Sequence, residues 1–305
     1  MSNTDAAGAG EPQVRGAEVD HTSFPHNPCA TCGACCRSYV VPVCGYDVWL
    51  ISTGQRLGPE QFVVACPQEE PGFDGFRLEA AGTTYGLALD KQGRFHPTQP
   101  CVFLMKFANG HMRCGIYPQR PSVCRVYPMS IWNGMVYKTE ESLCPPGAWP
   151  EDEPQRPNWR AALQRMYMHY DIYNEVVARW NARVARAGPG MRFTLHEYLS
   201  YLLNVYGRLA ALNSQLGDEQ LVKVQASWPT VPRPSISLAE LRVRVGQHPW
   251  LDYLMRARGV IDSFYPEVEP LPLLVLMPNY SASGPSHMPS GRVAQAGRRA
   301  AGGRY

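Results

Sequence analysis

The sequence contains no apolar run long enough to cross a bilayer. Its apolar stretches, such as Leu273 to Met277, fall far short of the ~20 residues that a transmembrane helix needs. It is also poor in lysine: 25 of its 29 basic residues are arginines, these are scattered, and the net charge is only +3. No basic patch that could follow a phosphate backbone is therefore present. Neither a membrane nor nucleic acid is an expected partner.

Several catalytic motifs are absent as well. The chain has no P-loop, no GxSxG and no HExxH, so neither phosphoryl transfer nor hydrolysis is indicated. Alternating βα units are missing, which argues against radical chemistry on a barrel. No strand runs into a Gly-rich turn and a helix, and the Gly-rich stretch Ala7 to Gly10 lies in a segment without apolar content.

Both ends of the chain are poor in core-forming residues. Residues 1–27 lack the apolar run of a secretory signal, which predicts a cytoplasmic protein with a disordered N-terminal arm. Residues 278–305 are rich in Gly, Ser, Ala and Arg, and predict a disordered tail. Because cytoplasmic thiols are kept reduced, we expect the cysteines of this chain not to be a disulfide framework.

Five prolines between Cys144 and Pro157 separate two kinds of sequence, so we place a domain boundary near residue 150. Upstream, residues 28–150 predict a small α+β domain with short helices at 45–57 and 59–65. Three β-hairpins are expected after them: 83–90 turning at Gln92-Gly93, 102–108 turning at Asn109-Gly110, and 127–132 turning at Asn133-Gly134. Asn-Gly is a strong signal for a tight hairpin turn, because both central residues need positive φ.

Downstream, residues 155–262 predict an α-helical domain. Apolar residues recur at alternating steps of four and three, the spacing of a packed helix face: Trp159, Leu163, Met166, Tyr170, Tyr173, Val177, Trp180 and Val184. Further helices are expected from Thr194 and Ser237, each with a capping box, and from Pro249. His169 and His196 have no second ligand one turn away, so neither is expected to bind metal. This helical domain is a candidate surface for a protein partner.

The cysteines carry the main functional signal. Of the ten in the chain, four form a CxxCxxCC run: Cys29, Cys32, Cys35 and Cys36. Adjacent side chains such as those of the last two diverge, so both can bind one metal only with strain. Four more cysteines follow, and three of them lie next to hairpins or to the Arg120-Pro121 turn, which would hold them rigidly: Cys101, Cys114, Cys124 and Cys144. Eight thiolates make two four-sulfur sites, or one such site and four other thiols.

All-cysteine sites accept zinc and iron–sulfur clusters alike, and the CxxCxxCC run matches no ferredoxin spacing. A four-thiolate site has a net charge near −2, which Arg37, Arg113 and Arg125, each adjoining a cysteine, are candidates to balance. The remaining cysteines, Cys44 and Cys66, lie among apolar residues and are expected to be ordinary buried thiols.

These motifs together resemble the CxxCxxCC cysteine-cluster family, zinc- or iron-chelating domains of the YkgJ type. The resemblance rests on CxxCxxCC at 29–36, on Cys101 followed by Phe103-Leu104, on CGIYPQRPSVCRVYP at 114–128 and on CPPG at 144–147. Val102 departs from it, because family members usually have proline after that cysteine. The match covers residues 29 to about 147.

The resemblance implies that eight cysteines hold an iron–sulfur cluster or zinc, with iron–sulfur preferred, and that Tyr117, Arg120, Pro121 and Arg125 form a supporting turn. One branch resembles flagellin lysine N-methylases, so a lysine N-methylase-like or redox enzyme using an iron–sulfur centre is the alternative. Two other functions fit these motifs. One is a module whose bound metal mainly stabilises the fold, and the other is a protein that passes zinc or iron to a client.

Overall fold

The computed structural model describes residues 32–68, 75–95, 99–132, 134–140, 142–149, 152, 154, 157–230, 236–244, 246–269 and 273–274. The predicted arm at 1–27, the predicted tail at 278–305 and Cys29 lie outside these ranges. The fold is α+β, as predicted, with small antiparallel sheets followed by a mostly helical region. Within the described ranges, no helix combines the length and the apolar character that crossing a membrane would require.

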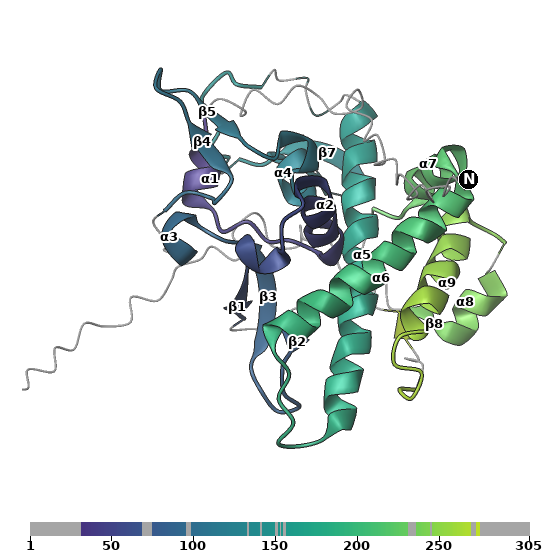
Figure 1. Cartoon of the computed structure of the whole chain (residues 1–305). Coiled ribbons are helices and arrows are strands. Elements are labelled where there is room, and N and C mark those ends of the chain that lie inside the picture. The colour runs from purple at the N-terminus through teal and green to yellow at the C-terminus, as the bar shows by residue number, and fades with distance from the viewer. Residues whose placement is uncertain are drawn as a thin grey trace, which may run out of the picture.

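The longest helix, α5, spans Pro157–Ala187 and lies at the centre of the molecule (Figure 1). Strands and short helices lie on one side of it, and the C-terminal helices lie on the other. The helices that follow are α6 (Leu195–Leu216), α7 (Asp218–Ser227), α8 (Leu238–Arg244) and α9 (Pro249–Asp262). The predicted apolar stripe of α5 is buried except for the half-buried Met166, which confirms the helix and its core face.

Thr194 caps α6 as predicted, because its hydroxyl oxygen accepts from the Glu197 amide while the Glu197 carboxylate accepts from the Thr194 amide. Helix α7 was not predicted from the sequence. One hydrophobic core joins the residues around α5 to those of the N-terminal half, since α2 (Gly45–Gln55) packs against both α5 and α6.

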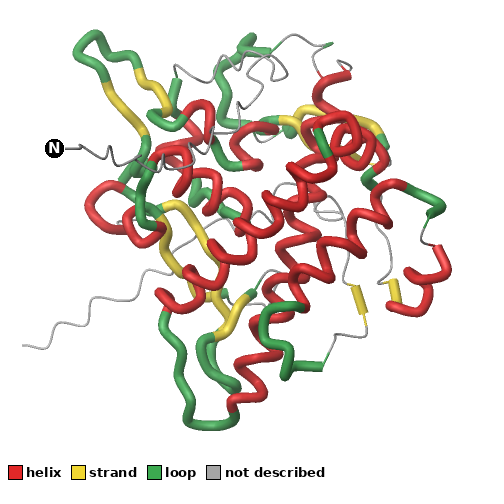
Figure 2. The backbone as a smooth tube through the Cα atoms, turned by 45° about the vertical axis from the view of Figure 1, so that its right-hand side comes forward, coloured by secondary structure: helices red, strands yellow, loops and turns green. Residues whose placement is uncertain are grey.

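In the part of the chain that the structure describes, the strands lie in four small sheets, seen in yellow in Figure 2. In the first sheet, β3 (Thr84–Leu89) lies between β1 (Val63–Pro67) and β2 (Phe76–Arg77). Two hairpins follow, β4 (Leu104–Lys106) with β5 (Met112–Cys114) and β6 (Met129–Trp132) with β7 (Met135–Lys138). A two-residue pair, β8 (Ile236–Ser237) with β9 (Leu273–Leu274), completes the set.

Two of the three predicted hairpins are confirmed, and their turn glycines Gly110 and Gly134 have φ of 82° and 76°. The third is wrong. Strand β3 pairs with β1 and β2, and Gln92-Gly93 belongs to a short helix, α3 (Gln92–Phe95). The helix predicted at 59–65 is also wrong, because only Pro59–Gln61 forms a 3₁₀ turn before β1 begins.

A buried polar chain joins α2 to α4 (Ser122–Val126) and α5. Both carboxylate oxygens of Asp47 accept hydrogen bonds: Oδ1 from the amide and hydroxyl of Ser122, each at 2.8 Å, and Oδ2 from the amide and thiol of Cys44 at 3.1 and 3.3 Å. The Ser122 hydroxyl lies 3.1 Å from Nδ1 of His169, whose ring stacks on Tyr46. Since that hydroxyl donates to Asp47, Nδ1 of His169 is the donor to Ser122. His169 is thus a buried histidine whose Nδ1 has a hydrogen-bond partner.

We expect the stability of the protein to fall with pH below about 6.5 because of His169. Burial first, and then Arg165 and Arg125, lower the pKa of this imidazole well below its usual value. The unfolded chain therefore takes up a proton that the folded chain refuses, which costs up to about 1.4 kcal/mol per pH unit. Urea unfolding between pH 7.5 and 5.5 should give a shallower pH dependence for His169→Gln than for the native chain. Parallel curves for the two proteins would contradict this assignment.

Candidate metal centre

Four cysteines from four separate segments converge on one region. Cys36 lies in α1 (Ala34–Ser38), Cys101 precedes β4, Cys114 ends β5, and Cys124 lies in α4. Each of the four thiols interacts electrostatically with the three others. A backbone hydrogen bond of 2.8 Å from the amide of Cys101 to the carbonyl of Cys36 joins two of these segments directly. We call this group the four-thiol set.

The other predicted ligands have different surroundings. The Sγ atom of Cys35 lies 4.0 Å from that of Cys36, so these adjacent thiols are in contact despite their expected divergence. Cys32 precedes α1, and its sulfur accepts from the Ala34 amide at 3.5 Å. Cys144 packs against a second apolar cluster formed by Met129, Trp149 and Trp159. Cys29 lies outside the described residues.

Burial and mutual repulsion set the protonation of the four-thiol set. Burial raises the pKa of Cys101 to about 12, and it also raises the pKa of Cys114 and, by more, of Cys124. The other thiolates of the set add to these increases. Cys36 differs, because a hydrogen bond with Cys35, and then Arg120 and Lys91, lower its pKa to about 7. A bound cation would reverse the repulsion, since it stabilises thiolates.

Two buried cations face these sulfurs. Lys91 is 2% exposed, donates to the carbonyl of Tyr39 at 2.5 Å and interacts with Cys36 and Cys101. Arg120 is 8% exposed, stacks over the ring of Tyr117 at 4.0 Å, and acts on Cys36, Cys114 and Cys124.

Neither cation adjoins a cysteine in the sequence, so adjacency was the wrong guide to charge balance. Arg125, one of the candidates, instead donates to the carbonyls of Arg120 and Pro118. No sequence pattern marks Lys91 as a partner of the cysteines, although it is one of only four lysines in the chain.

The supporting turn that the resemblance implied is present in the structure. It runs from a 3₁₀ turn at Tyr117–Gln119 into α4 at Ser122. The hydrogen bonds of Arg125 to its carbonyls and the stacking of Arg120 on Tyr117 fix this turn beside Cys124.

The chemistry of the donor set fits a soft metal or an iron–sulfur cluster, because both take thiolates. One buried polar atom supports this fit: Nε of Arg120 has no hydrogen-bond partner among the described residues, and thiolate or sulfide sulfur could accept from it. Spacing gives a further constraint. In the described part of the chain, no three His, Cys, Asp or Glu side chains lie close enough together to hold a single metal ion.

Comparison with known families identifies the segment that contains these thiols. Residues 28–145 match the CxxCxxCC family model. Its description is "Putative zinc- or iron-chelating domain". The matched segment contains the four-thiol set, Lys91 and Arg120, and it ends one residue after Cys144. No curated protein and no solved structure matches the chain at a significant level. This segment is therefore a zinc- or iron-chelating cysteine-cluster domain, and α5 to α9 lie beyond the match.

Proposed function

We propose that the CxxCxxCC domain holds an iron–sulfur cluster through Cys36, Cys101, Cys114 and Cys124. The observation that carries the proposal is the mutual interaction of all four thiols, which arrive from four separate segments. Four cysteines are the usual complement of a [2Fe–2S] or [4Fe–4S] cluster.

The spacing of the thiols favours a cluster over a single zinc ion. Zinc–sulfur bonds of about 2.3 Å bring the four sulfurs of a tetrahedral site to within ~3.8 Å of one another. The sulfurs of a cluster are farther apart, because iron and sulfide occupy the space between them. The four thiols interact electrostatically as a group, and among the described residues no three such side chains lie close enough together for one ion.

In this proposal, the side chains around the four thiols have defined roles. Lys91 and Arg120 balance the negative charge of the thiolates, and the Nε–H of Arg120 donates to sulfur. The contact of Cys35 with Cys36 favours the thiolate form of Cys36 by lowering its pKa. When bound, the cluster would cross-link the four segments that carry the thiols, and it would supply a redox couple. Cys32 and Cys144, two of the other predicted ligands, are dispensable for this centre.

Anaerobic purification, followed by an absorption spectrum and by iron, zinc and sulfide analysis of the same sample, tests the proposal. We expect broad absorption near about 400 nm with iron and sulfide in equal amounts. A colourless protein that holds zinc would overturn the iron–sulfur assignment while leaving the thiol site intact. Free thiols without either metal would overturn both.

Single Cys→Ser variants should identify the ligands. Cys101→Ser and Cys124→Ser should lose most of the bound metal, because each removes one soft ligand from the four-thiol set. Cys66→Ser is the matched control, since Cys66 lies half-buried in β1 opposite Gly86, and it should retain the metal of the native chain. Equal metal content in all three variants would contradict the assigned ligands.

A further inference from the structure

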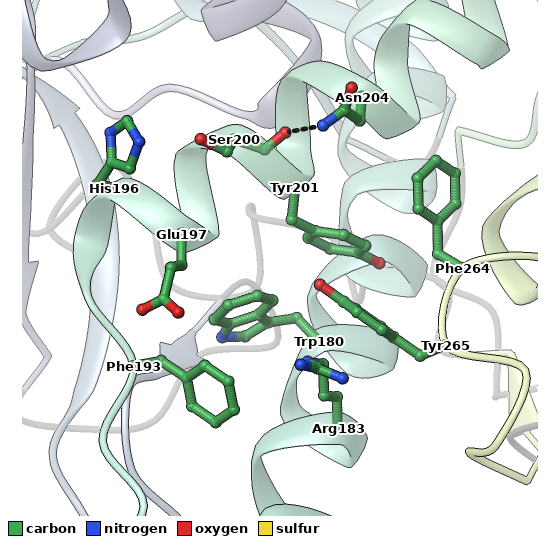
Figure 3. Close-up of a pocket in the computed structure, with 10 residues that line it drawn as sticks. All are labelled: Trp180, Arg183, Phe193, His196, Glu197, Ser200, Tyr201, Asn204, Phe264 and Tyr265. Carbon is green, nitrogen blue, oxygen red and sulfur yellow. Dashed lines mark hydrogen bonds between the residues drawn. The ribbon is translucent and has the colours of Figure 1, made fainter.

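The helical region has a hollow of about 390 Å³ between α5, α6 and the turn after α9, but its rings are already covered (Figure 3). Trp180 and Tyr201 are only 1% and 4% exposed. The guanidinium of Arg183 lies over the rings of Tyr265 and Phe193, at 4.1 and 5.4 Å. These four rings therefore have no face open to a ligand.

The β4–β5 hairpin, in contrast, projects from the body of the molecule (Figure 1). Its register sorts the side chains onto two faces, because directly paired residues of a ladder lie on the same face and neighbours along a strand alternate. Leu104 and Met112 lie on the inner face, where a Cβ at Gly33 would meet them at 3.4 and 3.0 Å. Gly33 is the N-cap of α1, so this face packs on α1. Cys114, the partner of Leu104, shares the inner face.

The other side of the hairpin is exposed. Met105 pairs there with Arg113, and the next pair continues the ladder with a hydrogen bond of 2.8 Å from the amide of Phe107 to the carbonyl of His111. Met105 and Phe107 are 44% and 46% exposed, and Arg113 and His111 are exposed too. Neither the guanidinium of Arg113 nor the imidazole of His111 has an ion-pair or hydrogen-bond partner among the described residues. We call these four residues the outer face.

The charge around the outer face is of one sign. Residues 91–139 contain seven Lys and Arg and no Asp or Glu, although the whole chain has a net charge of only +3. Two of these cations, Lys91 and Arg120, are buried against the thiols, whereas Lys106 and Arg113 are exposed on the hairpin. The exposed cations thus lie on the surface that a partner would meet, and an anionic partner would complement them.

A strip of apolar side chains beside a strip of cations fits a protein better than a nucleic acid or a bilayer. Aromatic residues, Met and Arg are the types enriched in protein interfaces. A phosphate backbone needs more cations in a row than this hairpin has, and a bilayer needs a larger apolar area than Met105 and Phe107 expose. So small a face belongs to the size class of weak redox encounters, which bury less than about 1,200 Å² in total.

We propose that the outer face docks a small acidic electron-carrier protein, which gives one electron to the cluster held by the four-thiol set. This inference rests on the proposed function, because only a bound cluster can accept the electron; the preference for an acidic partner rests on the outer face alone. Arg113 directly precedes Cys114 on β5, so a carrier docked there contacts the hairpin that holds a cluster ligand. The carrier is oxidised by one electron and the cluster is reduced by one, with no bond or proton transferred.

Oxidised plant-type ferredoxin, an acidic carrier, tests the proposal on the full chain, with cytochrome c, a basic carrier, as its counterpart. Isothermal titration calorimetry at low ionic strength should show ferredoxin binding roughly tenfold or more tightly than cytochrome c. Added salt should weaken the binding of ferredoxin, because it screens exposed charges. Equal binding of the two carriers, or no binding of ferredoxin, would overturn the proposal.

Two variants assign the binding to the outer face. Arg113→Glu and Phe107→Ser should each weaken ferredoxin binding about tenfold, through charge repulsion and through the loss of an apolar contact. Both should keep the metal content of the native chain, because neither side chain lies on the face of Cys114. The matched controls are Arg186→Glu in the last turn of α5 and Met191→Ser, which is 53% exposed, and both should bind ferredoxin like the native chain.

Three outcomes would contradict the proposal. The first is an equal loss of binding in the controls. The second is tighter binding of phosphatidylserine vesicles or of duplex DNA than of ferredoxin through the same two residues, which would assign the outer face to a membrane or to a nucleic acid. The third is ferredoxin binding by a protein whose iron and sulfide analysis finds only zinc, which would overturn the electron transfer together with the proposed function and leave a docking surface. A cluster without ferredoxin binding would overturn the docking alone.

Discussion

Replacement of Arg179 by leucine should lower the free energy of unfolding by roughly 3–5 kcal/mol, the usual cost of removing one partner from a buried charged network. The side chain of Arg179 is 2% exposed, and its guanidinium donates to four backbone carbonyls, that of Asp262 at the end of α9 and those of Phe264, Tyr265 and Glu269 after it. It also lies 3.6 Å from the carboxylate of Asp262. Leucine would remove this donor from all four carbonyls, of which that of Tyr265 would keep the Val268 amide as a donor.

Urea unfolding at constant pH measures this effect, with Arg186→Leu as the control. Arg186 lies on the same helix but is exposed, so its replacement should change stability far less. Equal stabilities of the two variants would show that the hydrogen bonds of Arg179 contribute little.

The helical half was predictable because its determinants are local. The stripe from Trp159 to Val184 defines a buried face of α5 with no knowledge of its neighbours, and Thr194 with Glu197 marks the start of α6 by hydrogen bonds within one turn. The two Asn-Gly hairpins belong to the same class, since the turn residues themselves require the conformation that the structure has.

The errors in the first sheet arise from distant pairing. Val63–Pro67 follows a 3₁₀ turn and could continue as a helix, but Val63 and Val64 are β-branched and pair with Leu89 and Ala88. Strand β3, which provides those partners, begins about twenty residues later and is covered on its other edge by β2. No local pattern reveals which strand will arrive to complete a ladder, and tertiary pairing overrides weak helical propensity.

The thiol site also divides into a part that local sequence predicts and a part that depends on the fold. The cysteine spacing predicted a thiol cluster, and Cys36, Cys101, Cys114 and Cys124 do converge. Their charge partners could not be found from adjacency, because the fold brings Lys91 and Arg120 to the sulfurs from other segments.

Replacement of Asp47 by alanine should have an effect as large as that of Arg179 and should also reach the thiol site. Asp47 is fully buried, and its removal leaves the amides of Cys44 and Ser122 and the Ser122 hydroxyl without their acceptor. Each buried group left unsatisfied costs about 1–3 kcal/mol, so the loss of stability is roughly 3–5 kcal/mol.

The link to the thiol site is α4, which begins at Ser122 and carries Cys124. Because Asp47 ties the first residue of α4 to the start of α2, Asp47→Ala should lower metal retention against a chelator as well as thermal stability. Asp47→Asn keeps one acceptor oxygen for Ser122 but turns an N–H toward the Cys44 amide, so it should fall between alanine and the native chain. Asp218→Ala, an exposed change in the first turn of α7, is the control. Full metal retention in a destabilised Asp47→Ala protein would show that Asp47 supports only the core, and that the position of Cys124 is fixed by the turn of Arg120 and Arg125 instead.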